Sequence, residues 1–104
     1  MYGPGTNLAH AGSIIFNSEC QINYICSAIE YMLSNDLKVI RVKPEIEKQY
    51  QDKFDMRHEK MVWQHPKVSS WYQNSKGKVV TTSPWRLVEY WNWTNNFNQD
   101  DYEF

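Results

Sequence analysis

Residues 13–34 read SIIFNSECQINYICSAIEYMLS, and most of the apolar side chains in this stretch recur every three or four positions. That spacing is typical of an α helix, and Asn35-Asp36 end it. Apolar residues surround much of the helix circumference. The stretch therefore predicts a long helix over 13–34 that is buried between two layers of structure.

The segment after this helix predicts one short strand and a second helix. Apolar and basic residues alternate over 37–43, which is typical of a short edge strand, and Pro44 ends it. Residues 45–63 carry one apolar stripe among many charges, which is typical of an amphipathic surface helix. His65-Pro66 stop this helix.

The last third of the chain predicts a second short strand and a helix rich in tryptophan. Residues 79–82 favour a strand because all four are β-branched. Ser83-Pro84 supply an N-cap and a first-turn proline for a helix through Trp93. The predicted fold class is α+β, with a long buried helix, a second amphipathic helix, a short β element and a C-terminal Trp-rich helix. The strands are expected to be short and unpaired at an edge.

The composition excludes several classes of protein. The 104 residues include 11 basic and 12 acidic ones, and a net charge of −1 excludes the basic surface of a dedicated nucleic-acid binder. No stretch approaches the ~20 apolar residues of a membrane span. No secretory leader is visible, so we expect a cytoplasmic protein. Cys20 and Cys26 are six positions apart on the predicted helix and are expected to be free thiols.

Aromatic residues are over-represented. They make up 15% of the chain, with five Trp and seven Tyr, and such rings concentrate in cores, at interfaces and around flat ligands. A domain of this size buries roughly 65% of its unfolded surface, so the aromatic content exceeds what one small core absorbs. The excess predicts a partner surface.

A glycine-rich segment precedes the long helix. Gly3-Pro4-Gly5-Thr6-Asn7 contains two glycines that allow backbone N–H groups to approach a ligand, and the helix N-terminus adds partial positive charge. Oxyanions and electron-rich carbonyls bind at such helix ends. The segment does not match GxGxxG or a P-loop. On its local pattern alone, an ordinary glycine-rich turn is the better explanation of this segment.

The polar loop 69–78 contains two adjacent large rings, Trp71-Tyr72. Rings in such a loop are typical either of a mobile cover over a ligand such as a nucleotide or of an anchor that fixes the loop to the body.

The three histidines form no catalytic or metal-binding pattern. His58-Glu59 begins like the HExxH motif of zinc proteases, but Val62 stands where the second histidine would be. His10, His58 and His65 are scattered along the chain, and polar or capping roles are expected for them. We therefore predict no metal site and no catalytic residue.

Taken in order, several motifs resemble the C-terminal end of flavin-containing Baeyer–Villiger-type monooxygenases, and are most similar to the 4-hydroxyacetophenone and cyclohexanone monooxygenase group. The resemblance covers nearly the whole chain. Its motifs are Tyr2-Gly3-Pro4-Gly5-Thr6-Asn7-Leu8, Ser13-Ile14-Ile15-Phe16, Glu19-Cys20-Gln21, Met61-Val62-Trp63, Ser70-Trp71-Tyr72 and Ser83-Pro84-Trp85-Arg86-Leu87.

The resemblance implies an enzyme that binds FAD and NADPH and inserts one oxygen atom from O2 into a ketone or heteroatom substrate. Residues 1–36 would be the C-terminal end of the FAD-binding domain. Residues 37–104 would be a C-terminal extension with a mobile loop that covers the cofactor.

The resemblance also implies roles for individual residues. Gly3, Gly5, Thr6 and Asn7 would lie against the flavin, with the N-terminus of helix 13–34 toward its pyrimidine end. Leu8, Ala9 and His10 would approach the substrate. Trp71 would contact the nicotinamide cofactor NADP, and Asn74 and Lys78 are further candidates for that contact.

Both GxGxxG fingerprints of this family are absent from the chain, as is the arginine expected to stabilise the oxygenated flavin. The chain is therefore expected to be inactive by itself and to need the missing N-terminal nucleotide-binding part as its partner, with self-association as a further expectation. The alternative is a small non-enzymatic protein-interaction module with an aromatic-rich binding face.

Overall fold

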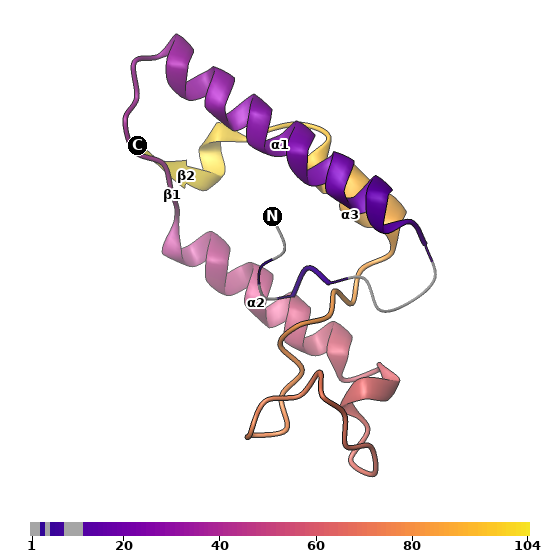
Figure 1. The fold of residues 1–104 in the computed structure, drawn as a ribbon. Coiled ribbons are helices and arrows are strands. Elements are labelled where there is room, and N and C mark those ends of the chain that lie inside the picture. Colours follow the sequence, from indigo (N-terminus) through magenta and orange to yellow (C-terminus); the bar gives the residue numbers. More distant parts are fainter. Residues whose placement is uncertain (1–2, 4, 8–11) are drawn as a thin grey trace.

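The computed structural model describes residues 3, 5–7 and 12–104 and has a mixed helical and β architecture (Figure 1). The described residues form three α helices, α1 (Ile14–Ser34), α2 (Pro44–His58) and α3 (Leu87–Thr94). Strands β1 (Arg41–Val42) and β2 (Tyr102–Glu103) form a two-stranded sheet. Two short 3₁₀ helices, η1 (Val62–Gln64) and η2 (Gln99–Asp101), complete the elements.

Helix α1 confirms the predicted helix over 13–34, because local sequence sets both of its ends. The Ser13 Oγ accepts a hydrogen bond from the Phe16 N–H at 3.2 Å, which caps the first turn. At the other end the Asn35 side-chain amide donates to the Tyr31 carbonyl at 2.8 Å. Asp36 then adopts a left-handed φ of 51°, which turns the chain out of the helix.

The prediction that this helix is buried between two layers is wrong for the chain as it stands. One side of α1 packs against α3 (Figure 1), and the buried residues of α1 are Asn17, Cys20 and Gln21. On the rest of the helix Ile15 is 70% exposed and Leu33 is 76% exposed. The described part of the chain supplies one layer only, so the second apolar face of α1 meets solvent.

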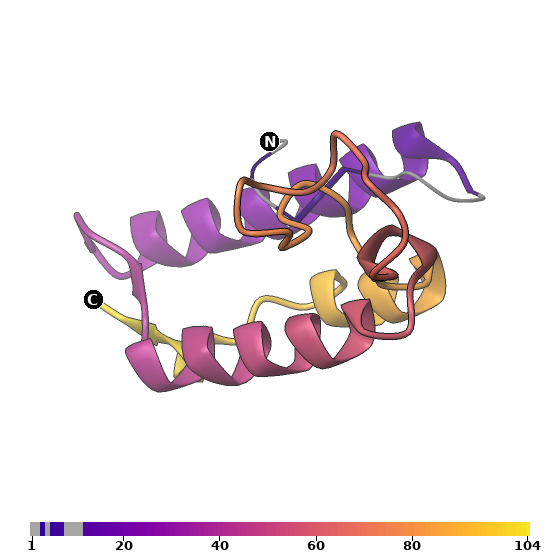
Figure 2. The same ribbon diagram turned by 90° about the horizontal axis from the view of Figure 1, so that it is seen from below.

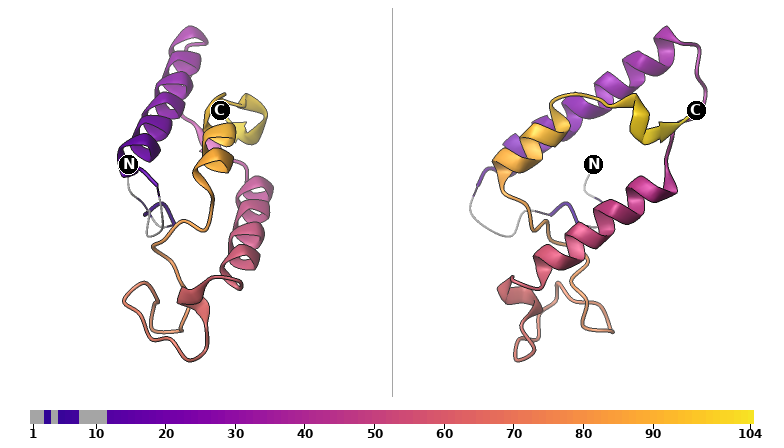
Figure 3. Two further views of the ribbon diagram at one scale, coloured as in Figure 1. Left: turned by 90° about the vertical axis from the view of Figure 1, so that its right-hand side faces the viewer. Right: turned by 180° about the vertical axis from the view of Figure 1, so that it is seen from behind.

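The molecule is elongated. Its principal extents are 51 × 28 × 19 Å and its radius of gyration is 15.3 Å, compared with about 13 Å for a compact domain of this length. Helices α1 and α2 run as two separate rows (Figure 2), and the loops after α2 project beyond the helices (Figure 3). Because the molecule is elongated, few of its described residues are buried and its core is small.

The second helix ends five residues earlier than the predicted 45–63. After His58 the helix tightens, with the Lys60 N–H donating to the Arg57 carbonyl at 3.3 Å. The chain then turns so that η1 meets the loop 69–78, where the Gln73 side-chain amide donates to the Trp63 carbonyl at 2.7 Å. These tertiary hydrogen bonds override the local helical pattern.

The predicted edge strand over 37–43 is reduced to β1 and is not unpaired. It pairs antiparallel with β2, with Arg41 opposite Glu103 and Val42 opposite Tyr102. Residues 79–82 form no strand, which corrects the second β prediction. They make only isolated bridges, Gln73 with Val79 and Asn7 with Thr82, because each neighbouring segment offers one residue in register.

The last helix starts at Leu87 and not at Ser83-Pro84. The Ser83 N–H is held by the Asn7 carbonyl at 2.8 Å, so residues 83–85 stay outside the helix and are buried. The cap is instead the Glu89 carboxylate, which accepts from the Arg86 N–H at 2.9 Å. No helix among the described residues is both long enough and apolar enough to span a membrane.

Aromatic rings fill the centre of the core. Trp85 is 5% exposed, and its ring lies edge-on to Phe54 at 6.4 Å and to Trp93 at 4.8 Å between centroids. The Trp85 Nε1–H donates to the Tyr50 Oη at 3.0 Å, so the indole is satisfied inside the core. Helix α2, the segment 83–85 and α3 are joined through these rings.

Candidate functional site

The glycine-rich segment lies beside residues 80–83. The Gly5 N–H donates to the Val80 carbonyl at 2.8 Å, and the Asn7 N–H donates to the Thr81 carbonyl at 3.0 Å. The Thr6 N–H and Oγ1–H both donate to the Gly3 carbonyl, at 3.3 and 2.7 Å. The N–H groups of Gly5, Thr6 and Asn7 therefore serve the chain's own backbone, and the expectation that they are free for a ligand does not match this geometry.

Glycine is required at position 5 for two reasons. Its φ of +72° is left-handed, a conformation that a side chain disfavours. A Cβ built there would lie 2.7 Å from the Phe54 Cε2 atom. The Phe54 ring therefore fills the space that the missing side chain leaves.

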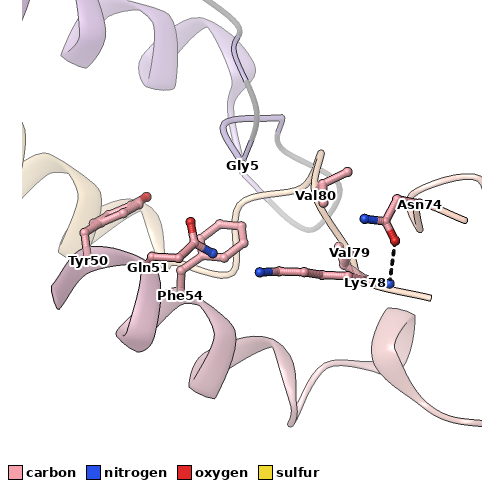
Figure 4. Close-up of a pocket in the computed structure, with 8 residues that line it drawn as sticks. All are labelled: Gly5, Tyr50, Gln51, Phe54, Asn74, Lys78, Val79 and Val80. Carbon is pink, nitrogen blue, oxygen red and sulfur yellow. Dashed lines mark hydrogen bonds between the residues drawn. The ribbon is translucent and has the colours of Figure 1, made fainter. Parts of the chain in front are cut away.

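A pocket of about 320 Å³ opens beside Gly5 (Figure 4). It brings together three residues named by the family resemblance, Gly5, Asn74 and Lys78, which come from two distant parts of the chain. Its other lining residues come from α2 and the segment 79–80 and are Tyr50, Gln51, Phe54, Val79 and Val80. No motif in the sequence assigned these α2 residues to a site. The i, i+4 spacing of Tyr50 and Phe54 was the signal for a shared face.

The charge in this pocket comes from Lys78. Its Nζ lies 3.0 Å from the Asp55 Oδ2 in a half-exposed ion pair. Asn74 shapes the adjacent turn, because its side-chain oxygen accepts from the N–H groups of Lys76 and Lys78 at 2.9 and 3.0 Å. Gly77 completes the turn with a φ of +76°. The pocket is therefore a polar-rimmed hollow over an aromatic floor.

Trp71 does not line this pocket. It is 74% exposed, and its ring lies 4.3 Å from the Tyr72 ring, which in turn meets Trp63 edge-on at 5.2 Å. Tyr72 thus anchors the loop while Trp71 presents a ring to solvent. Gly3 is exposed, and Leu8, Ala9 and His10 lie outside the described residues.

His58 is a core residue, which corrects the expectation of a polar or capping role. It is 3% exposed, lies edge-on to Phe54 at 4.5 Å, and its Nε2–H donates to the Thr82 carbonyl at 3.0 Å. Its Nδ1 is buried and has no hydrogen-bond partner among the described residues. Burial lowers the pKa of the imidazole below its ordinary value. His65 does cap a turn, because its Nδ1 accepts from the Lys67 N–H at 3.2 Å.

The stability of the chain should depend on the protonation of His58. The pKa of the folded state lies below that of the unfolded state, so the unfolded chain takes up the proton first and the free energy of unfolding falls as pH drops below about 6.5. Urea unfolding at a series of pH values should show this loss. His58→Gln should flatten it. A profile that His58→Gln leaves unchanged would contradict a buried neutral imidazole.

The described residues contain no group of three or more His, Cys, Asp or Glu side chains that could hold a metal ion. Both cysteines are free, with Cys20 buried and Cys26 exposed.

The chain is similar in sequence to parts of much longer curated proteins. An uncharacterized monooxygenase of Sinorhizobium fredii is 40% identical over 102 residues, which are 98% of this chain and 15% of that protein. An FAD-binding monooxygenase of Aspergillus niger is 29% identical over 94 residues, 86% of this chain and 15% of that protein. A Baeyer–Villiger monooxygenase of Pseudomonas aeruginosa is 29% identical over 91 residues, 84% of this chain and 17% of that protein. No protein-family model matches the chain, and no solved structure matches it.

Proposed function

We propose that this chain, which is homologous to a segment of monooxygenases, is the C-terminal piece of a flavin-dependent monooxygenase. In this proposal it completes the enzyme's site only together with the rest of the enzyme. The chain spans about 15% of the length of the curated relatives it matches. The division into an FAD-domain end at 1–36 and an extension at 37–104 is part of this proposal.

The observation that carries the proposal is an apolar face of α1 that lies opposite its packed face. We call this face the α1 stripe. Its members are exposed apolar side chains that recur along one side of the helix, namely Ile15, Ile22, Ile25, Ile29 and Leu33. Each is between 45% and 76% exposed. Contiguous apolar surface of this kind on a helix marks an interface. The rest of the monooxygenase is the occupant we propose for it.

The residues of the glycine-rich segment partly fit the flavin role that the resemblance implies. The open space at Gly3, where a Cβ would meet nothing within 4 Å, allows a flat ring system to approach the backbone there. At Gly5 the Phe54 ring already occupies that space. The pocket of about 320 Å³ is at the small end of the roughly 300–1,000 Å³ of ligand sites. Most of the contacts to FAD would therefore come from the missing part.

Bound FAD would supply the redox chemistry that activates O2, and NADPH would supply the reducing equivalents. In this proposal Gly3, Gly5, Thr6 and Asn7 support the flavin. The exposed Trp71 ring stacks on the nicotinamide, and Asn74 and Lys78 lie beside it. Leu8, Ala9 and His10 approach a ketone or heteroatom substrate. The solvent-facing ring of Trp71, fixed through Tyr72, supports the stacking role.

The proposal predicts that FAD binding needs both parts. The isolated chain should lose all FAD on desalting. A chimera in which this chain replaces the matching segment of the Sinorhizobium fredii monooxygenase should retain flavin as its unaltered parent does, and the parent lacking that segment should not. Flavin absorbance per polypeptide measures each case. A stoichiometric flavin complex of the isolated chain, or a folded chimera that holds no flavin beside a parent that does, would contradict the proposal.

A further inference from the structure

A second pocket, of about 370 Å³, lies between α2, α3 and the paired strands. Aromatic rings dominate its wall and come from five residues, Tyr24, Tyr50, Tyr90, Trp93 and Tyr102. It shares only Tyr50 with the pocket beside Gly5. All of its lining residues belong to the described chain, so its wall does not depend on the proposed monooxygenase partner.

The charge of this second pocket is negative. Glu47 and Asp101 line it, and no lysine, arginine or histidine is among its lining residues. The ion pairs among the described residues use other carboxylates, those of Glu89 and Asp55. Lys43 does not line the pocket, and its ammonium donates to the Asp100 carbonyl at 2.6 Å. Glu47 and Asp101 are thus the charged residues of the pocket lining, and neither is in an ion pair among the described residues.

The ring hydroxyls hold the wall in place and stay uncharged. The Tyr24 and Tyr102 hydroxyls lie 2.8 Å apart in a hydrogen bond, and the Tyr50 Oη accepts from the Trp85 Nε1–H. Burial raises the pKa of both Tyr24 and Tyr50 above the ordinary value. The wall is therefore built of neutral rings, whose faces carry partial negative charge.

We propose that this pocket binds a small organic cation, a protonated or quaternary amine with an apolar body. Aromatic rings attract such cations through their faces, and this attraction strengthens where water is displaced. Glu47 and Asp101 add opposite charge at the same site. An anion would meet two unpaired carboxylates, and a neutral ligand would leave them without a partner, so charge selects the cation.

The test compares choline with its neutral carbon isostere, 3,3-dimethylbutanol, on the full chain by calorimetric titration. Loss of the positive charge should weaken binding about tenfold or more. Glu47→Gln should weaken choline binding about fivefold and leave the isostere unaffected. The matched control is Glu45→Gln, which changes the same charge in the same helix turn outside the pocket and should leave both affinities unchanged.

Asp101→Asn removes the other carboxylate of the pocket and is a second, independent test of its effect on choline affinity. Circular dichroism verifies that each variant is folded. Added salt should weaken choline binding more than isostere binding. Equal affinity for the two ligands would overturn the proposal. So would the absence of saturable choline binding, or a Glu47→Gln effect no larger than that of Glu45→Gln.

Discussion

Gly5→Ala should lower the free energy of unfolding by about 2–4 kcal/mol, measured by urea denaturation. A left-handed φ of +72° disfavours alanine, and its Cβ would overlap the Phe54 ring at 2.7 Å. Phe54 is 5% exposed and packs between Trp85 and His58, so its ring has little room to move. The substitution would therefore disturb the glycine-rich segment and the core together.

Two other glycines separate the cost of the left-handed φ from the cost of the overlap with Phe54. Gly77 has nearly the same φ, +76°, but a Cβ there would meet nothing within 4 Å, so Gly77→Ala should cost only about 1 kcal/mol. Gly3→Ala, with open space and no left-handed φ, should change stability by less than about 0.5 kcal/mol. Equal losses of unfolding free energy for the alanine substitutions at positions 5 and 77 would show that the overlap with Phe54 adds nothing to the cost.

Charging the α1 stripe should prevent the chain from joining the rest of a monooxygenase. In the Sinorhizobium fredii chimera, the pair Ile25→Lys and Ile29→Lys would place two ammonium groups in an apolar interface, at a cost of several kcal/mol. We expect flavin retention to fall at least tenfold. In the isolated chain these side chains are 45% and 49% exposed, so the same pair should leave its circular dichroism spectrum and thermal midpoint nearly unchanged.

Asn23→Lys provides a control that adds one ammonium group to α1, against the two that the isoleucine pair adds. Asn23 is exposed on the same helix but lies outside the stripe, so its substitution changes the charge of α1 without burying an ammonium. The control chimera should keep its flavin. If Asn23→Lys and the isoleucine pair lowered flavin retention equally, the helix would be sensitive to charge in general and the stripe would have no special role.

The parts of the fold that local sequence determines were predictable. Helix α1 was one of them, because its apolar period, its Ser13 cap and its Asn35-Asp36 end all lie within the helix or beside it. Strand β2 was not predictable, since two residues have no detectable period and pair only because the chain end returns to β1. The end of α2 at His58 likewise depends on tertiary hydrogen bonds to the loop that follows.

The candidate site divides in the same way. Family resemblance named Gly5 and Asn74 by their positions in motifs, and the structure places both on one pocket. The family resemblance could not reveal that Phe54 occupies the space beside Gly5, because that contact joins residues 49 positions apart in the sequence. The burial of His58 was hidden for a similar reason: its partner is a carbonyl at Thr82.

Thiol modification of α1 tests most directly whether the α1 stripe is an interface. Cys26 is exposed and Cys20 is buried, so a maleimide should label Cys26 rapidly and Cys20 slowly in the isolated chain. We predict that Cys26 is labelled at least about a hundredfold more slowly in the flavin-containing chimera, as followed by peptide mass spectrometry. Equal Cys26 labelling rates in the isolated chain and the chimera would contradict the account, because α1 would then remain open to solvent in the assembled enzyme.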